Sequence, residues 1–92
     1  MQRTIHKYEL GPIGNNKSVD LPKGAVVRSF YIQNGEPCIW VEFDIENTDD
    51  EVERLFFVCG SGITFDAKYK YICSTHDGDY TWHLFEKLKG RK

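Results

Sequence analysis

Hydrophobic and polar residues alternate with a period of two along most of this chain, and turn-forming residues interrupt the alternation at short intervals. A period of two puts successive side chains on opposite faces of an extended strand, so the pattern predicts β-structure throughout. No segment keeps the period of a helix. The predicted strands cover residues 3–10, 18–21, 25–33, 37–45, 52–59, 69–75 and 80–86, and residues 63–68 fit either an extended segment or a single helical turn.

Turn residues lie between the predicted strands. The clearest turn signals are Pro22-Lys23-Gly24, Asn34-Gly35 and Asp77-Gly78. An Asn-Gly pair between two alternating segments is the strongest local signal for a tight hairpin. Short strands joined in this way predict an all-β fold, a small antiparallel sandwich or barrel of six to seven short strands. We expect a single domain over residues 1–92, with a frayed basic tail at 88–92.

The segment 52–59 is unusual because it is apolar on both faces. Val52, Phe56 and Val58 share one face, and Leu55, Phe57 and Cys59 share the other. A strand of a two-layer antiparallel protein normally has one face exposed to solvent. Either a crowded core with one covering loop or an interface between subunits explains the pattern, and we expect the interface and therefore a homo-oligomer.

Charge is segregated along the chain. The 92 residues carry a formal net charge of −2, but seven acids and no base lie between Glu42 and Glu53. The rest of the chain holds 12 bases against 7 acids. This balance argues against long nucleic acid, whose binding needs many phosphate contacts. A small anionic ligand needs only a few local cations and stays possible.

The absence of a membrane span, a secretory leader and a paired-cysteine motif bears on where the protein is located and on whether its cysteines are oxidised. No apolar run approaches the roughly 18 residues of a membrane span, and the first residues do not resemble a secretory leader. We therefore expect a soluble cytoplasmic protein with no membrane partner. Cys38, Cys59 and Cys73 have no C-x-x-C spacing, so we expect three reduced and mostly buried thiols.

The segment Gly60-Ser61-Gly62 is a candidate anion site. Two glycines allow a sharp turn that leaves amides pointing outward, and the hydroxyls of Ser61 and Thr64 lie beside them in sequence. The segment matches neither a nucleotide-binding P-loop nor a dinucleotide fingerprint. A plain turn without function is the alternative interpretation.

Catalytic and metal motifs are not supported by the sequence. The G-x-S-x-G elbow of hydrolases is absent. A nucleophile at Cys59 or Ser61 would need a histidine base within reach, and no spacing requires one. His76-Asp77-Gly78-Asp79 is better explained as a hairpin turn than as a metal site. We expect no cofactor, no metal and no enzymatic activity.

Several segments together resemble a family of small phage-encoded β proteins of about this length. They are Ile5-His6-Lys7-Tyr8, Leu21-Pro22-Lys23-Gly24-Ala25, Gln33-Asn34-Gly35, Pro37-Cys38-Ile39-Trp40, Phe57-Val58-Cys59-Gly60-Ser61-Gly62 and Tyr80-Thr81-Trp82-His83-Leu84-Phe85-Glu86. The resemblance implies an anti-defence protein acting in the host cytosol, similar to oligomeric sponges that sequester cyclic nucleotide signals without cleaving them. It brings no catalytic motif.

We therefore expect a homo-oligomer that binds a small phosphorylated nucleotide signal, such as a cyclic dinucleotide, between subunits. Phosphate would meet the amides of Gly60 and Gly62 and the hydroxyls of Ser61 and Thr64. The neutralising cation would be Lys23 or Arg28, and the bases would lie against Tyr8, Trp40 or His83. The alternatives are a module that binds a host protein through its acidic segment and apolar strand, and a hydrolase using Cys59 or Ser61.

Overall fold

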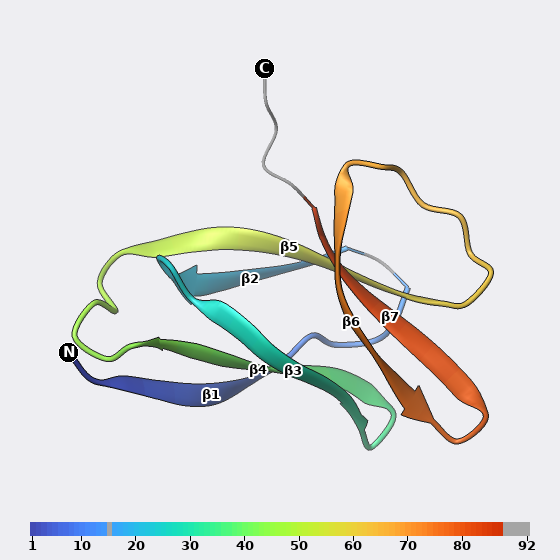
Figure 1. The fold of residues 1–92 in the computed structure, drawn as a ribbon, viewed down its shortest axis with the longest axis horizontal. Coiled ribbons are helices and arrows are strands. Elements are labelled where there is room, and N and C mark those ends of the chain that lie inside the picture. The colour runs from blue at the N-terminus through green and yellow to red at the C-terminus, as the bar shows by residue number, and fades with distance from the viewer. Residues whose placement is uncertain (15, 88–92) are drawn as a thin grey trace.

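A computed structural model describes residues 1–14 and 16–87, in which seven strands and no helix are present (Figure 1). The strands are β1 (Arg3–Glu9), β2 (Lys17–Pro22), β3 (Val26–Gln33), β4 (Glu36–Asp44), β5 (Glu51–Gly60), β6 (Tyr69–Asp77) and β7 (Tyr80–Lys87). The all-β prediction is confirmed. The largest difference in bounds is in β6, which continues to Asp77 because His76 and Asp77 pair with the start of β7. The predicted tail at 88–92 lies outside the described residues.

The strands form two antiparallel sheets. One has the order β1-β4-β3 and the other the order β2-β5-β7-β6. In Figure 1, β2 and β5 lie above β1 and β4, and β6 and β7 extend to the right. A buried apolar cluster with members from both sheets holds them together, so the protein is a small β-sandwich.

The predicted alternation in β4 is confirmed. Ile39 and Val41 are fully buried, whereas Trp40 and Glu42 on the other face are half-buried. The predicted strand 37–45 is one residue too long at this end, because β4 ends at Asp44 and Ile45 is 43% exposed. The buried cluster consists of Leu10, Leu21, Ala25, Phe30, Ile39, Val41, Phe43, Phe56, Val58 and Leu84.

The Asn34-Gly35 hairpin has the backbone that its sequence predicts. Asn34 has a φ of 53° and Gly35 a φ of 80°. Two successive positive φ angles are those of a type I′ turn, whose twist matches that of the flanking strands. This turn joins β3 to β4 and fixes their register, with Gln33 opposite Glu36.

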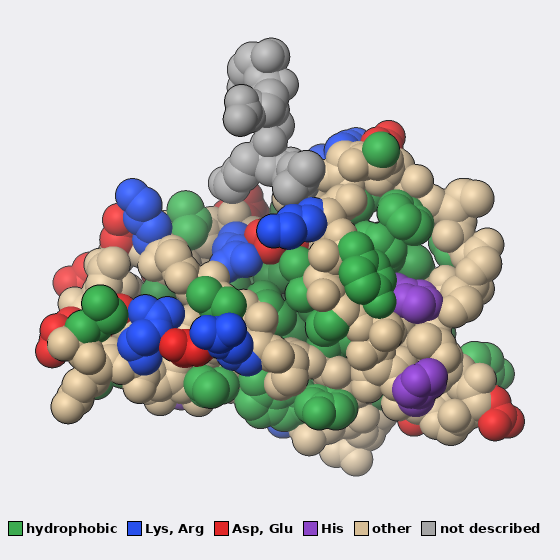
Figure 2. All heavy atoms as spheres, in the orientation of Figure 1, with side chains coloured by type: hydrophobic (Ala, Val, Ile, Leu, Met, Phe, Trp, Pro, Cys, Tyr) green, Lys and Arg blue, Asp and Glu red, His purple; other side chains and the backbone are tan. Residues whose placement is uncertain are grey.

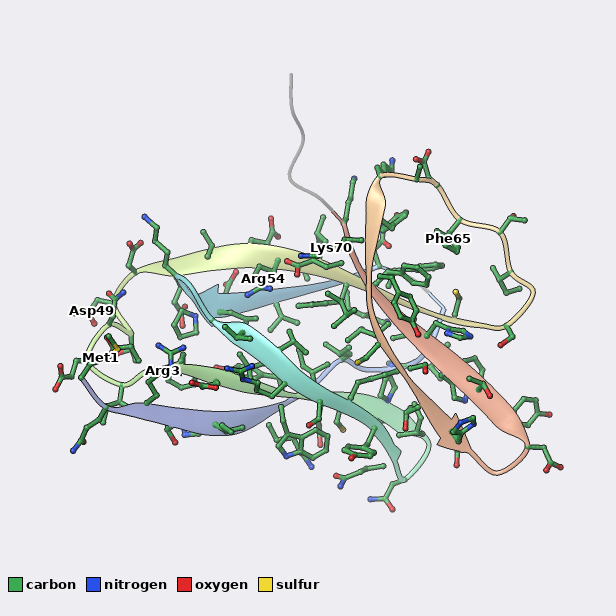
Figure 3. The ribbon with its side chains drawn as sticks, viewed as in Figure 1. Met1, Arg3, Asp49, Arg54, Phe65 and Lys70 are labelled. Atoms are coloured by element: carbon green, nitrogen blue, oxygen red, sulfur yellow. The ribbon has the colours of Figure 1, made fainter. Side chains whose placement is uncertain are left out.

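The second apolar face of β5 is partly covered by the β5–β6 loop, residues 61–68. Phe57 packs against Phe85 of β7, and Phe65 of the loop lies 4.2 Å from Phe85 between ring centroids. Figure 3 shows Phe65 pointing from the loop toward the sheet. The ambiguous segment 63–68 is thus an irregular covering loop that ends in a turn. Phe65 remains 49% exposed, and the predicted subunit interface stays a prediction.

Candidate functional site

Ser61 and His83 are brought together by the register of β5 and β7. Cys59 lies opposite His83 in this pair of strands. Because side chains two residues apart point to the same side, Ser61 follows Cys59 toward His83. The Ser61 hydroxyl lies 2.8 Å from Nε2 of His83, a normal hydrogen-bond length. The two residues are 22 apart in the sequence, so the contact depends wholly on strand pairing.

Tyr71 lies on the other side of the His83 ring. Its hydroxyl is 3.4 Å from Nδ1 of His83, at the long end for a hydrogen bond. A neutral imidazole carries its proton on one nitrogen only. With the proton on Nδ1, His83 points its N–H at the Tyr71 oxygen and accepts from Ser61 through Nε2. Three side chains from β6, β7 and the β5–β6 loop therefore form a row of hydrogen-bonding groups.

This row borders a cavity of about 250 Å³, which we call the serine cavity. Its lining residues are Cys59, Gly60, Ser61, Gly62, Ile63, Phe65, Tyr71, His83 and Phe85. Gly62 has a φ of +90°, which favours glycine, and this bend turns the loop away from β5. The volume is slightly below the range of about 300–1,000 Å³ typical of small-molecule sites. It suits one polar group of a larger ligand.

A second cavity of about 440 Å³, the tryptophan cavity, adjoins the first. Its lining residues are Ile13, Gly14, Phe57, Val58, Cys59, Gly60, Ser61, Ile63, Tyr80 and Trp82. Cys59, Gly60, Ser61 and Ile63 line both cavities, which therefore lie on two sides of the end of β5. The lining of the second cavity is mostly apolar and aromatic.

Four of the predicted site residues meet at this place. Gly60, Ser61, Gly62 and His83 line the serine cavity, and Thr64 does not. Lys23 is far away, because its amide donates to the Asp50 carbonyl at 2.7 Å, beside the start of β5. Ser61 follows the other end of β5, and ten residues of strand span roughly 30 Å. The predicted pairing of Lys23 with a phosphate at Ser61 is therefore not present in one chain.

Arg28, Trp40 and Tyr8 lie elsewhere in the sandwich. Arg28 donates from Nε to a carboxylate oxygen of Glu42 at 2.6 Å. Trp40 makes an edge-to-face contact with Tyr31 at 5.6 Å between ring centroids. Tyr8 packs against the buried cluster, and burial, aided by the charge of Glu51, raises the pKa of its phenol. None of the three lines the serine cavity or the tryptophan cavity.

Charged groups lie mainly at the other end of the molecule. Figure 3 places Asp49 of the acidic segment beside the N-terminus, opposite the loop that carries Phe65. Figure 2 shows histidine and hydrophobic side chains over β6 and β7, while acidic and basic side chains gather mainly over the left half. Among the described residues, neither cavity is lined by Lys, Arg, Asp or Glu. A ligand there would meet hydroxyl, imidazole and backbone groups.

Two features of the structure were missed by sequence reasoning. Tyr71 completes the row at His83, and alternation predicts its face but not its partner. Arg54 interrupts the apolar pattern of β5, and its partners are not visible in that pattern. It donates to both carboxylate oxygens of Glu86, at 2.7 and 2.8 Å, and to the carbonyl of Ala25. These contacts tie one sheet to the start of β3 in the other.

Cys59 lines both cavities but is a poor nucleophile. Its side chain is buried at 6% exposure, and burial raises the pKa of its thiol. A raised pKa leaves less of the reactive thiolate at neutral pH. Of the two candidate nucleophiles, Ser61 is the one that shares a hydrogen bond with a histidine.

Two features are absent from residues 1–14 and 16–87. No group of three or more His, Cys, Asp or Glu side chains is placed to hold a metal ion in that part of the chain. In the same part, no helix is long and apolar enough to cross a membrane.

Comparison with known proteins places the whole chain in one family. No curated protein and no solved structure matches it. A family described as a domain of unknown function, DUF7352, matches residues 1–92. Since the match covers the chain from end to end, this protein belongs to the DUF7352 family.

Proposed function

We propose that this protein binds a small nucleotide through a phosphate held in the serine cavity, and sequesters it without cleaving it. The observation that carries the proposal is the Ser61–His83 hydrogen bond of 2.8 Å at a cavity bordered by Gly60, Gly62 and Ile63. Hydroxyl, imidazole and backbone amide groups all bind phosphate oxygens when they converge. No described residue accepts a hydrogen bond from the amides of Ser61 and Gly62, so these donors are open to a ligand.

The lack of Lys and Arg in the described lining of the cavity determines whether a phosphodiester or a phosphomonoester fits it better. Within the described chain its lining holds no Lys or Arg, so the phosphate would meet hydroxyl, imidazole and amide groups and no Lys or Arg side chain. A phosphomonoester carries up to two negative charges near neutral pH, whereas a phosphodiester carries one. Burying charge without a partner is costly. The cavity therefore suits a phosphodiester, as in a cyclic dinucleotide, better than a terminal phosphate.

The surroundings of His83 favour binding of the nucleotide without cleavage. A strong general base usually has its second nitrogen fixed by a carboxylate, but the neighbour of Nδ1 here is the neutral hydroxyl of Tyr71 at 3.4 Å. This arrangement orients the ring without stabilising an imidazolium. The anti-defence role in a phage-infected cell rests on the resemblance described above, and it is part of the proposal.

A thermal-shift screen against cyclic di- and trinucleotides and ADP-ribose derivatives tests the proposal. A ligand at 100 times its Kd stabilises by about 2.7 kcal/mol, which raises the Tm of so small a domain by several degrees. We expect Ser61→Ala and His83→Ala to reduce the shift. Lys23→Glu, which changes a charge at the far end of β5, is the control and should keep it. A flat panel, or a shift that survives both cavity variants, would contradict the proposal.

Hydrolysis is the second candidate function, and one observation favours it. The Ser61 hydroxyl is already hydrogen-bonded to a histidine nitrogen that is able to accept its proton. Chromatography of a nucleotide recovered from the denatured complex separates the two functions. Sequestration returns the intact nucleotide, whereas hydrolysis returns a product, which must vanish in Ser61→Ala.

A further inference from the structure

We infer that the tryptophan cavity is the base subsite of the nucleotide whose phosphate lies in the serine cavity. The inference rests on the proposed function and adds the position and recognition of the base. Its starting observation is that the two cavities share Cys59, Gly60, Ser61 and Ile63. A ligand with a phosphate beside Ser61 therefore has an adjoining space on the other side of the end of β5.

The size and lining of this space fit a base with its sugar. Its volume of about 440 Å³ lies within the range of small-molecule sites. Two isoleucines line it, Ile13 from the β1–β2 loop and Ile63 from the β5–β6 loop. The lining holds no charged side chain among the described residues, which suits an uncharged aromatic ring and not a second phosphate.

Trp82 and Tyr80 offer stacking surfaces. Their rings lie 6.0 Å apart between centroids and are inclined by only 26°. A Cβ atom on Gly60 would stand 3.5 Å from Cζ3 of Trp82, so the indole packs against the backbone at the end of β5. Tyr80 is 67% exposed, and the core does not require an aromatic residue there. Aromatic side chains hold bases by stacking on their faces, and this contact tolerates any base because every base has a π-face.

The edge of β5 beside this cavity supplies hydrogen-bonding groups. Pairing of β2 with β5 ends at Lys17 opposite Phe56, whereas β5 continues to Gly60. Successive strand residues turn their N–H and C=O groups to opposite edges. Of Phe57, Val58 and Cys59, at least one therefore directs both groups away from β7. No hydrogen bond to this edge comes from residues 1–14 or 16–56. A base stacked on Trp82 meets this edge with its own donors and acceptors.

The experiment titrates the protein with cyclic di-AMP and with cyclic di-GMP. Calorimetry measures the affinity, and tryptophan fluorescence reports contact with the indole. Trp40 and Trp82 are the two tryptophans of the chain. Trp40→Phe leaves Trp82 as the single emitter and is also the control variant, because Trp40 lies on the other sheet. We expect binding of either nucleotide to quench the fluorescence of Trp82. We also expect Trp82→Leu to weaken binding about 5- to 150-fold, the range that one stacked base supplies.

Tyr80→Ser tests the same cavity even if Trp82→Leu does not fold, because Tyr80 is mostly exposed. It should fold normally and weaken binding by a smaller factor. Unchanged Trp82 fluorescence on binding, with unchanged affinity in Trp82→Leu and Tyr80→Ser, would overturn the inference and leave the proposed function standing, since Ser61→Ala would still weaken binding. A nucleotide whose affinity responds to neither Ser61 nor Trp82 would overturn both.

Discussion

Arg54 and Glu86 form a two-pronged ion pair between neighbouring strands of one sheet, and Arg54 also donates to the Ala25 carbonyl that precedes β3 in the other sheet. Both side chains are about four-fifths buried, at 19% and 18% exposure. Buried charges are tolerated only when hydrogen bonds satisfy them. Glu86 therefore holds Arg54 in place for its hydrogen bond to Ala25, the contact that reaches the other sheet, and loss of either charged partner is costly.

Removal of one partner should destabilise the sandwich. We expect Glu86→Gln and Arg54→Met each to lower the free energy of unfolding by about 1–3 kcal/mol, because each leaves a mostly buried group without its partner. The midpoint of urea unfolding measures the loss. The double variant should lose less than the sum of the two single losses. Strict additivity would show that the two side chains do not interact in solution.

Phe65 is predicted to stabilise the protein by covering the outer face of β7. Phe65→Ala removes a ring that packs 4.2 Å from Phe85 between centroids, but half of that ring already faces solvent. We expect a loss of about 1–2 kcal/mol, below the roughly 3–5 kcal/mol for a buried phenylalanine. Phe56→Ala, at a fully buried site, is the comparison. Equal losses in the two variants would mean that the loop is part of the core.

The strands were predictable because each is a local pattern. The alternation of Ile39, Val41 and Phe43 with Trp40 and Glu42 is visible without any knowledge of partners. The Asn34-Gly35 turn likewise depends on two adjacent residues. Such signals fix which face of a strand is buried. They do not fix which strand lies beside which.

The candidate site was predictable only in part, because it depends on strand pairing. The glycine turn around Ser61 was visible in the sequence, but its contact with His83 follows from the pairing of β5 with β7. The pairing of β2 with β5 places Lys23 beside the start of β5, so the length of that strand separates it from Ser61. The sequence alone does not say whether Trp40 and Trp82 belong to the core, an interface or a site; the structure places Trp82 in the lining of the tryptophan cavity and Trp40 against Tyr31 on the other sheet.

The cysteines are predicted to react slowly in the native protein. Cys38 is 1% exposed and Cys59 6% exposed, while Cys73 is half-buried. Burial raises the pKa of all three thiols and so lowers their thiolate fraction at pH 8. With a disulfide reagent such as DTNB, we expect Cys73 to react first and the other two to react fully only after unfolding. Rapid labelling of Cys59 in Cys73→Ser would instead reveal an accessible thiol at the cavities and revive Cys59 as a nucleophile.

Acid should remove a stabilising contribution of Glu42, which lies on the outer face of the three-stranded sheet. Glu42 accepts hydrogen bonds from Arg28 and from Arg3, and these two guanidinium groups hold the pKa of its carboxyl below the ordinary value of 4.5. A carboxyl with a lowered pKa in the folded state stabilises the protein above its unfolded pKa, and this contribution is lost as the pH falls through the folded pKa. The loss therefore begins near pH 4.5 and continues below it.

Urea unfolding of the wild type and of Glu42→Gln between pH 7 and pH 3 isolates this contribution from that of the other carboxyls. We expect the wild type to be the more stable above about pH 5, and the difference to shrink steadily below pH 4.5 as Glu42 takes up a proton. Glu46→Gln, in an exposed residue of the same acidic segment, should give curves parallel to those of the wild type. A difference for Glu42→Gln that stays constant down to pH 3 would mean that the arginines stabilise the fold by packing, because a protonated carboxyl no longer attracts them.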